Sequence, residues 1–146
     1  MTIAEGDTFP LERLATTVGG PAIVYFYPRD KTPGCEVEAR GFSDLYDRFR
    51  EAGIEVVGVS VDSEESHRSF AEECGIPFPL ASDEDASLTS QLGILKDYGE
   101  HGTMAGRVTY LLDRDGVVQR VWAVSDVLTH PAEALEAALE LAAQPS

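Results

Sequence analysis

The sequence lacks the features that mark several large classes of protein. It has two cysteines in 146 residues and no Cys-x-x-Cys pair. Two cysteines are too few for the disulfide framework of a small secreted domain. No apolar run approaches the roughly 20 residues that cross a bilayer, and Met1–Asp7 has neither a basic start nor an apolar stretch. We therefore expect a cytoplasmic protein with no secretory signal and no membrane partner.

Basic residues are also scarce. The chain has 26 acidic residues against 11 basic ones, a formal net charge of -15, and its only lysines are Lys31 and Lys96. Such a surface repels phosphates, which argues against a nucleic-acid partner. It resembles the surfaces of proteins from salt-accumulating cells. In such cells, high ionic strength screens the repulsion between like charges of one chain. An ordinary acidic protein is the alternative.

Histidines and cysteines show no metal-binding pattern. His67, His101 and His130 lie far apart, and none has metal-ligand spacing with Cys35 or Cys74. We therefore predict no zinc site, no other metal and no cofactor.

The first half of the chain predicts parallel strands joined by helices. Pro21–Tyr27 and Ile54–Val61 are apolar, β-forming runs typical of buried strands. After the first run, apolar residues recur at helical spacing as far as Gly53, and Asp62 with Glu65 offers the start of a second helix that ends at Gly75. The order strand, helix, strand, helix implies a right-handed parallel crossover.

The second half differs in kind. Arg107–Asp113 and Val117–Val124 resemble strands joined by a turn through Gly116. A last helix is expected to start near Thr129 and Pro131, with its inward face formed by Ala132, Leu135, Ala138 and Leu139. The whole order predicts one α/β domain over residues 1–146, with a thioredoxin-like fold in which helices flank a central mixed β-sheet.

The segment 25–35 carries the clearest chemical signal. A strand ends, a loop rich in proline and glycine follows, and Cys35 stands at the start of the next helix. Free backbone N–H groups and the helix dipole favour a thiolate there, and the thiolate is the reactive form of cysteine. The alternative is that Cys35 is a small buried apolar residue and that Arg107 is a surface charge.

The motif Pro-x-x-x-Thr-x-x-Cys, formed by Pro28, Thr32 and Cys35, resembles the active-site signature of peroxiredoxins. The surrounding residues YFYP and TPGC are similar to the bacterioferritin-comigratory or Q-type subfamily, and the similarity continues through 78–83 and 106–116. The resemblance implies a thiol peroxidase with antioxidant and redox-homeostasis functions. Cys35 would attack the hydroperoxide and become a sulfenic acid. Thr32 would hydrogen-bond the peroxide, Pro28 would shield the sulfur, and Arg107 would complete the site.

The chain departs from this subfamily at position 40. Many Q-type members carry a second, resolving cysteine five positions after the first, where this chain has Arg40. Some members resemble this chain in carrying the resolving cysteine on the next helix, which implies Cys74 and recycling by a thioredoxin-type reductant. Joining Cys35 to Cys74 would require the helix around Cys35 to unwind. The region before the first strand is also short, so the early hairpin of such proteins is expected to be trimmed.

Other functions remain open at this stage. Cys74 could be an inert thiol packed beside Phe70, leaving a one-cysteine peroxidase reduced by an external thiol. A non-catalytic thioredoxin-like redox sensor would share Cys35 without turnover. A thiol–disulfide oxidoreductase is disfavoured because the sequence has no Cys-x-x-Cys. A glutathione-peroxidase-like enzyme is disfavoured because the sequence shows no supporting Trp and Gln constellation; its only tryptophan, Trp122, lies on the late hairpin. We expect a monomer or a weak dimer.

Overall fold

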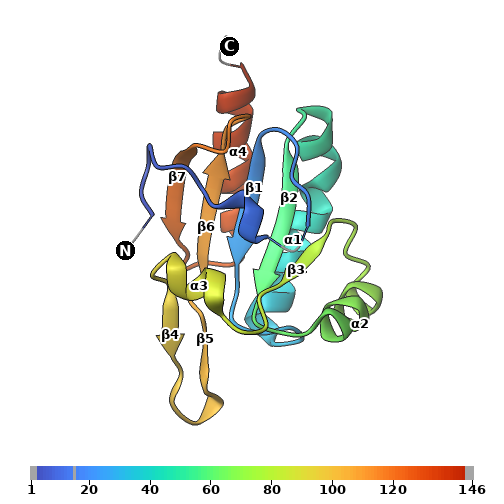
Figure 1. Ribbon diagram of the computed structural model, residues 1–146. Coiled ribbons are helices and arrows are strands. Elements are labelled where there is room, and N and C mark those ends of the chain that lie inside the picture. Colours follow the sequence, from blue (N-terminus) through green and yellow to red (C-terminus); the bar gives the residue numbers. More distant parts are fainter. Residues whose placement is uncertain (1–2, 15, 144–146) are drawn as a thin grey trace.

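The central element is a five-stranded mixed sheet with the strand order β3-β2-β1-β6-β7 (Figure 1). The computed structural model describes residues 3–14 and 16–143; Met1 and Thr2, which begin the segment expected to carry no secretory signal, lie outside them. Strands β1, β2 and β3 run parallel, and β6 runs antiparallel to both β1 and β7. The strands are β1 (Ala22–Phe26), β2 (Glu55–Ser60), β3 (Leu80–Ser82), β6 (Val108–Leu112) and β7 (Val118–Ala123).

Three helices cover one face of this sheet. They are α1 (Pro33–Glu51), α2 (Glu64–Cys74), which lies at the β3 edge, and α4 (His130–Ala143) (Figure 1). Ile23 and Tyr25 of β1 pack into this layer, whereas Val24 and Phe26 point to the other face. Because β1 is covered on both faces, all five of its residues are buried and its sequence is apolar throughout. The predicted thioredoxin-like mixed sheet is confirmed.

The opposite face is covered by shorter segments. They include Phe9, the 3₁₀ turn η1 (Leu11–Arg13) and the short helix α3 (Ser87–Gln91), whose Leu88 is buried against the sheet. Within the described residues no strand precedes β1, and only an isolated bridge joins Thr8 to Val117. This agrees with the expected trimming of the early hairpin.

Two local predictions were wrong. Helix α2 is capped by Ser63, whose Oγ accepts a hydrogen bond from the Ser66 N–H at 3.1 Å. Asp62 had been expected there, but its carboxylate instead accepts the Asp30 N–H at 2.7 Å. In α4, Ala132 is exposed, because the buried face runs through Pro131, Ala134, Leu135, Ala137 and Ala138.

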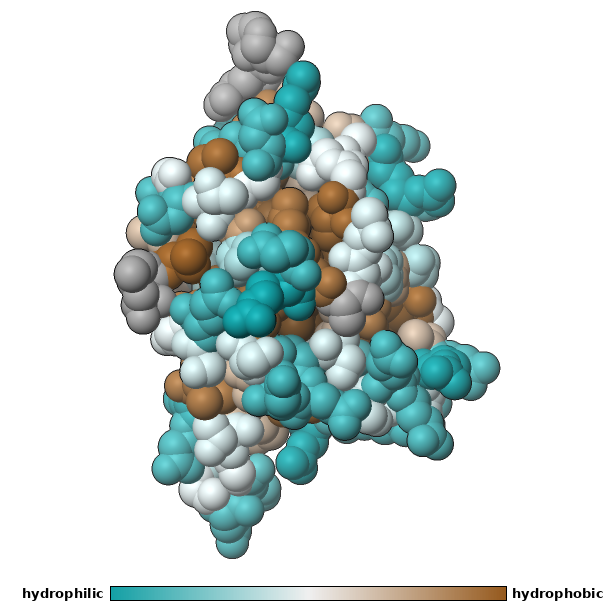
Figure 2. All heavy atoms as spheres, in the orientation of Figure 1, coloured by the Kyte–Doolittle hydropathy of each residue, from teal (hydrophilic) through white to brown (hydrophobic). Residues whose placement is uncertain are grey.

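A small antiparallel hairpin was not expected from the sequence. It consists of β4 (Leu95–Asp97) and β5 (Thr103–Ala105), joined through the 3₁₀ turn η2 (Gly99–His101), and it projects below the main sheet in Figure 1. Hydrophilic residues gather at its tip and over α2 (Figure 2). None of the helices in 3–14 and 16–143 has the length and apolar character of a membrane crossing.

Candidate active site

Cys35 is the third residue of α1, directly after the loop that follows β1. Thr32 is the N-cap residue, and its carbonyl accepts the Glu36 N–H at 2.8 Å. Pro33 occupies the first position of the helix, where its missing N–H costs no hydrogen bond. Cys35 therefore belongs to the first turn of a long helix, where backbone N–H groups lack helical partners and the helix dipole is positive, and only 1% of its surface is exposed.

Arg107 meets Cys35 from a distant part of the chain. Antiparallel pairing places Val108 opposite Phe26, so the residue before β6 lies beside the end of β1. Arg107 Nη2 lies 3.5 Å from Cys35 Sγ, and its Nη1 donates to Glu38 Oε1 at 2.9 Å. A Cβ on Gly34 would come within 3.1 Å of Nη2, so glycine leaves the space that the guanidinium occupies.

Glu38 is a part of the site that the sequence analysis missed. Its carboxyl is fully buried, and within the described chain Oε2 has no hydrogen-bond partner. Burial raises the pKa of Glu38 to about 7, although the Arg107 guanidinium opposes that rise. Glu38 stands one helical turn after Cys35, on a face that is otherwise apolar and buried. An acidic residue on a buried helix face is the signal that could have found it.

Thr32 and Pro28 border the site. Thr32 Oγ1 donates to the Arg29 carbonyl at 3.0 Å, which leaves its oxygen lone pairs as acceptors. Pro28 and Arg107 line a hollow of about 550 Å³, together with Lys96, Tyr98, Gly106, Val108, Ala123, Val124 and Ser125. A larger hollow bordered by Arg13 and Arg68 contains none of the motif residues.

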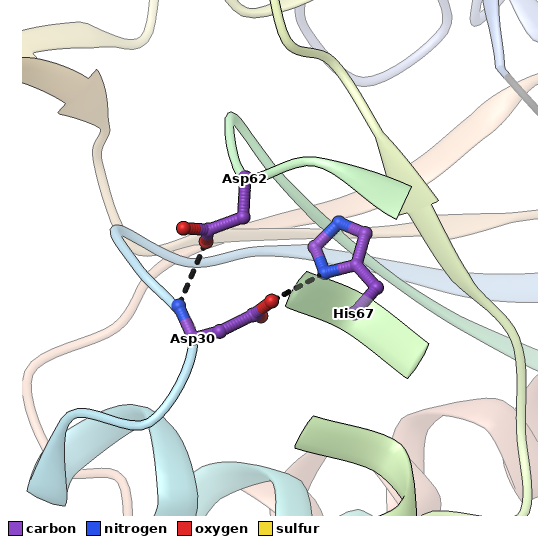
Figure 3. Close-up of side chains that lie close together, drawn as sticks. All are labelled: Asp30, Asp62 and His67. Atoms are coloured by element: carbon purple, nitrogen blue, oxygen red, sulfur yellow. Dashed lines mark hydrogen bonds and ion pairs between the residues drawn. The ribbon is translucent and has the colours of Figure 1, made fainter. Parts of the chain in front are cut away.

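A buried polar network fixes the loop between β1 and Cys35 (Figure 3). Asp30 is at its centre: one carboxylate oxygen accepts the Tyr27 hydroxyl at 2.5 Å, and the other lies 2.8 Å from His67 Nδ1 and accepts the Ser66 hydroxyl at 2.8 Å. His67 Nε2 lies 3.1 Å from the Ala81 carbonyl. These contacts tie the loop to α2 and β3.

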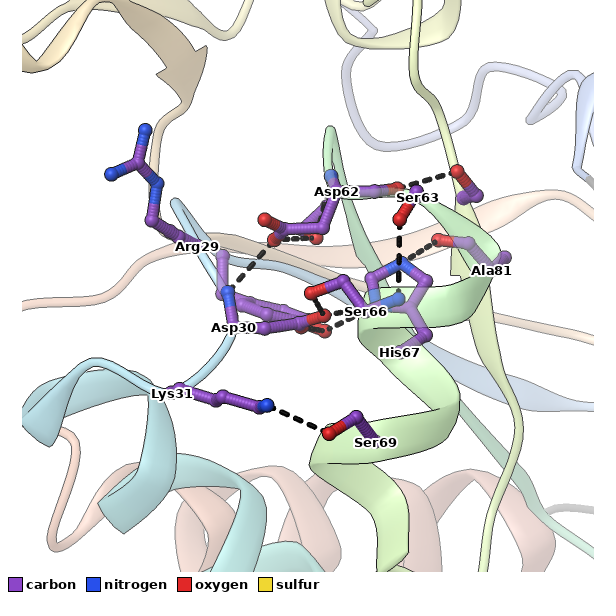
Figure 4. A network of polar contacts seen from close by, with 12 residues as sticks. Arg29, Asp30, Lys31, Asp62, Ser63, Ser66, His67, Ser69 and Ala81 are labelled. Carbon is purple, nitrogen blue, oxygen red and sulfur yellow. Dashed lines mark hydrogen bonds and ion pairs between the residues drawn. The ribbon is translucent and has the colours of Figure 1, made fainter.

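Two neighbouring residues extend the network (Figure 4). Lys31 adopts a left-handed backbone conformation with φ of 65°, and its Nζ donates to Ser69 at 2.7 Å on α2. The carboxylate of Asp62, which follows β2, accepts hydrogen bonds from the Asp30 N–H and the Ser60 hydroxyl. The backbone that leads into Cys35 is therefore held from both sides.

Asp30, Asp62 and His67 also bring three metal-ligand types together. One ligand atom from each lies within 4.8 Å of the others. The Asp30 and Asp62 oxygens nevertheless serve as hydrogen-bond acceptors from the protein, and both His67 nitrogens face protein oxygens. A metal ion would have to break several of these bonds, so the set fits a structural network better than a metal centre.

Cys74 lies where the sequence analysis expected it, at the last residue of α2. Its sulfur is a free thiol, half-buried at the edge of the core, and Cys35 is also free. The Cys74 Sγ is 4.0 Å from Arg40 Nη2. The structure thus unites Cys35, Arg107 and Glu38, while Cys74 lies beside a later turn of α1.

The family model of the AhpC/TSA family matches residues 3–121. The chain belongs to the AhpC/TSA family. Among its curated relatives, the putative peroxiredoxin bcp of Coxiella burnetii is 39% identical over 132 residues, covering 88% of this chain and 85% of that protein. Chloroplastic peroxiredoxin Q of Sedum lineare is 50% identical over 104 residues, which cover 71% of this chain and 55% of the relative. This AhpC/TSA chain spans about half the length of the chloroplast relatives that it matches.

Solved structures of the same family have the same fold. Peroxiredoxin Q of Xanthomonas campestris is 37% identical, with a TM-score of 0.79 over 86% of this chain and 81% of that one. A cysteine-to-serine mutant of PrxQ from Xylella fastidiosa is 30% identical, with a TM-score of 0.84 over 94% and 96%. The resemblance to Q-type peroxiredoxins is confirmed over nearly the whole described chain.

Proposed function

We propose that this protein is a thiol peroxidase in which Cys35 reduces hydrogen peroxide and organic hydroperoxides. One observation carries the proposal: Cys35 Sγ lies at the N-terminus of α1 and 3.5 Å from the Arg107 guanidinium. Two sources of positive potential therefore converge on one sulfur, which stabilises its thiolate. The bacterioferritin comigratory protein of Xanthomonas campestris, a relative of known structure that is 35% identical, has alkyl peroxide reduction activity.

The first step is a displacement at oxygen. The Cys35 thiolate attacks one oxygen of the hydroperoxide, the O–O bond breaks, and the sulfur becomes a sulfenic acid. The released alkoxide or hydroxide takes up a proton and leaves as an alcohol or as water. Arg107 stabilises the negative charge as it moves from sulfur to oxygen, and Thr32 Oγ1 accepts a hydrogen bond from the peroxide. Pro28 limits the access of water to the sulfur.

The organic part of a substrate has a place beside these groups. The hollow that contains Pro28 and Arg107 is bordered by Tyr98, Val108 and Val124, which offer apolar surface. An organic hydroperoxide can therefore direct its peroxide end toward Arg107 and its carbon chain into this hollow.

Cys74 is the proposed resolving residue. Its thiolate would attack the Cys35 sulfenic sulfur, form an intramolecular disulfide and expel hydroxide, which takes up a proton to become water. A thioredoxin-type dithiol would then reduce the disulfide to restore both thiols. The alternatives remain a one-cysteine peroxidase reduced by an external thiol and a redox sensor without turnover.

The test compares two single-cysteine variants. Cys35→Ser should abolish peroxide consumption with its fold intact, because a serine hydroxyl is too weakly acidic to replace the thiolate. Cys74→Ser should still consume one equivalent of peroxide and then become over-oxidised. Mass measurement after one equivalent of peroxide reports the sulfenic acid or the internal disulfide. Near-normal consumption by Cys35→Ser would refute the assignment, and a wild-type sulfenic acid with free Cys74 would favour the one-cysteine mechanism.

A further inference from the structure

Arg40 forms a bridge between Cys74 and the helix that carries Cys35. Its Nε and Nη2 donate to Glu36 Oε1 at 3.1 and 2.9 Å, and the same Nη2 lies 4.0 Å from Cys74 Sγ. One guanidinium thus contacts a carboxylate one turn after the helix start and a thiol on α2.

The charges around Cys74 oppose each other. Burial raises the pKa of the Cys74 thiol, and Glu36 raises it further, whereas Arg40 lowers it and Glu73 raises it. The net pKa is raised, so in this conformation the thiol stays protonated and is a poor nucleophile. Asp44 and Ser43 line the same hollow, and Asp44 also faces Arg40. Arg40 is the only positive charge among these groups of the described chain.

The reaction itself would change this balance. Cys35 is buried and bound at Arg107, and position 40 lies about 7.5 Å further along the helix axis at 1.5 Å per residue. The Cys35 sulfur is held beside Arg107, whereas the Cys74 sulfur lies beside Arg40. A disulfide tolerates roughly 4.4–6.8 Å between Cα atoms, and we expect the first turn of α1 to unwind when Cys35 joins Cys74. Glu36 belongs to that turn, whereas Arg40 belongs to the next one. Unwinding therefore separates Glu36 from Arg40 and leaves the guanidinium beside Cys74.

We propose that Glu36 and Arg40 form a switch for Cys74: Glu36 neutralises Arg40 while α1 is intact, and unwinding of the first turn frees Arg40 to activate the Cys74 thiol. Cys74 is then nucleophilic only when the Cys35 sulfenic acid has come within its reach. The Cys74 thiolate attacks the Cys35 sulfenic sulfur, the disulfide forms, and hydroxide leaves and takes up a proton to become water. Arg40 is a positioning residue, and this inference rests on the proposed role of Cys74 as the resolving thiol.

The first test reads Cys74 alone, in a Cys35→Ser background. Its rate of alkylation by iodoacetamide is measured from pH 6 to 10 in dilute buffer. At pH 7.5, Arg40→Gln should slow the reaction and Glu36→Gln should speed it, each about two- to fivefold, because a half-exposed charge contact has about that strength. Arg40→Lys should restore most of the rate, and molar KCl should remove most of the differences. The matched control is Arg48→Gln, an exposed arginine two turns further along α1.

The second test reads the resolving step in chains that keep both cysteines. Rapid quenching after one equivalent of peroxide separates formation of the disulfide from oxidation of Cys35. Both Arg40→Gln and Glu36→Gln break the same helix pair, so any effect through helix stability has the same sign in both. Only loss of Arg40 removes the activating charge. Disulfide formation should therefore be about two- to fivefold slower in Arg40→Gln than in Glu36→Gln.

The outcomes distinguish failure of the proposed switch from failure of the proposed peroxidase function. Opposite changes in alkylation, together with slow resolution in Arg40→Gln, support the switch. Identical alkylation profiles in Arg40→Gln and Arg48→Gln would overturn it while leaving the peroxidase intact. Absence of a Cys35–Cys74 disulfide in the oxidised wild type would overturn both the switch and the role of Cys74, whatever the alkylation rates.

Discussion

The buried carboxyl of Glu38 makes the stability of this protein depend on pH in a way that can be calculated. Its pKa is about 7 in the folded chain, because burial disfavours the charged form, against an ordinary value of 4.5. A raised carboxyl pKa contributes stability that is fully present below the unfolded value and is lost as pH rises through the folded one. The linkage relation gives a loss of about 2 kcal/mol between pH 5.5 and 8. This loss already includes the stabilising effect of Arg107, since Arg107 is part of what sets that pKa.

Glu38→Gln removes the titration while keeping the shape of the side chain. We expect the free energy of unfolding of Glu38→Gln, minus that of the wild type, to increase by about 2 kcal/mol from pH 5.5 to 8. Urea denaturation at fixed ionic strength measures it, and pH 5.5 stays above the isoelectric point of about 4.4. Glu36→Gln, on the exposed side of the same helix, is the matched control and should follow the wild type. If the free energies of unfolding of Glu38→Gln and the wild type changed in parallel from pH 5.5 to 8, Glu38 would be ionised over that whole range, and the reasoning would be refuted.

Four further predictions concern the site, its supporting loop and the surface. Arg107→Ala should slow oxidation of Cys35 about 100-fold in rapid-quench measurements, because the charge that stabilises the transition state is gone; an unchanged rate would place Arg107 outside the site. Gly34→Ala should slow it less, since the new Cβ would come within 3.1 Å of Arg107 Nη2 and displace it. Asp30→Ala should lower the free energy of unfolding by roughly 3 kcal/mol in urea, because it removes the central acceptor of a buried polar network, whereas the exposed substitution Glu136→Ala should change it by under about 0.5 kcal/mol. If the acidic surface is an adaptation to salt, the melting temperature should rise steeply toward molar KCl, and a flat or falling curve would remove that interpretation.

Features that depend on neighbouring residues could be predicted from the amino-acid sequence. Periodicity and turn residues placed β1 and β2 within a residue or two of their observed ends, because an apolar run closed by proline or glycine has few alternatives. The same local logic set Cys35 at the start of a helix, and it began the later strand at Arg107, one residue before the observed start of β6. The N-cap of α2 was misplaced by one residue because Asp62 and Ser63 are both good caps. The tertiary structure was needed to show that the Asp62 carboxylate accepts a hydrogen bond from the Asp30 N–H.

The contacts that surround Cys35 with charged side chains depend on the tertiary structure. Pairing of β6 with β1 brings Arg107 to Cys35 across 72 positions, and the inward face of α1 then buries Glu38 against that guanidinium. Packing of α2 against the sheet joins His67 to Asp30, and it sets Cys74 beside Arg40. Residue spacing along the chain does not predict these contacts, because strand register and helix packing act between segments far apart in sequence. Local pattern thus located the proposed nucleophile, and the fold supplied the charges around it.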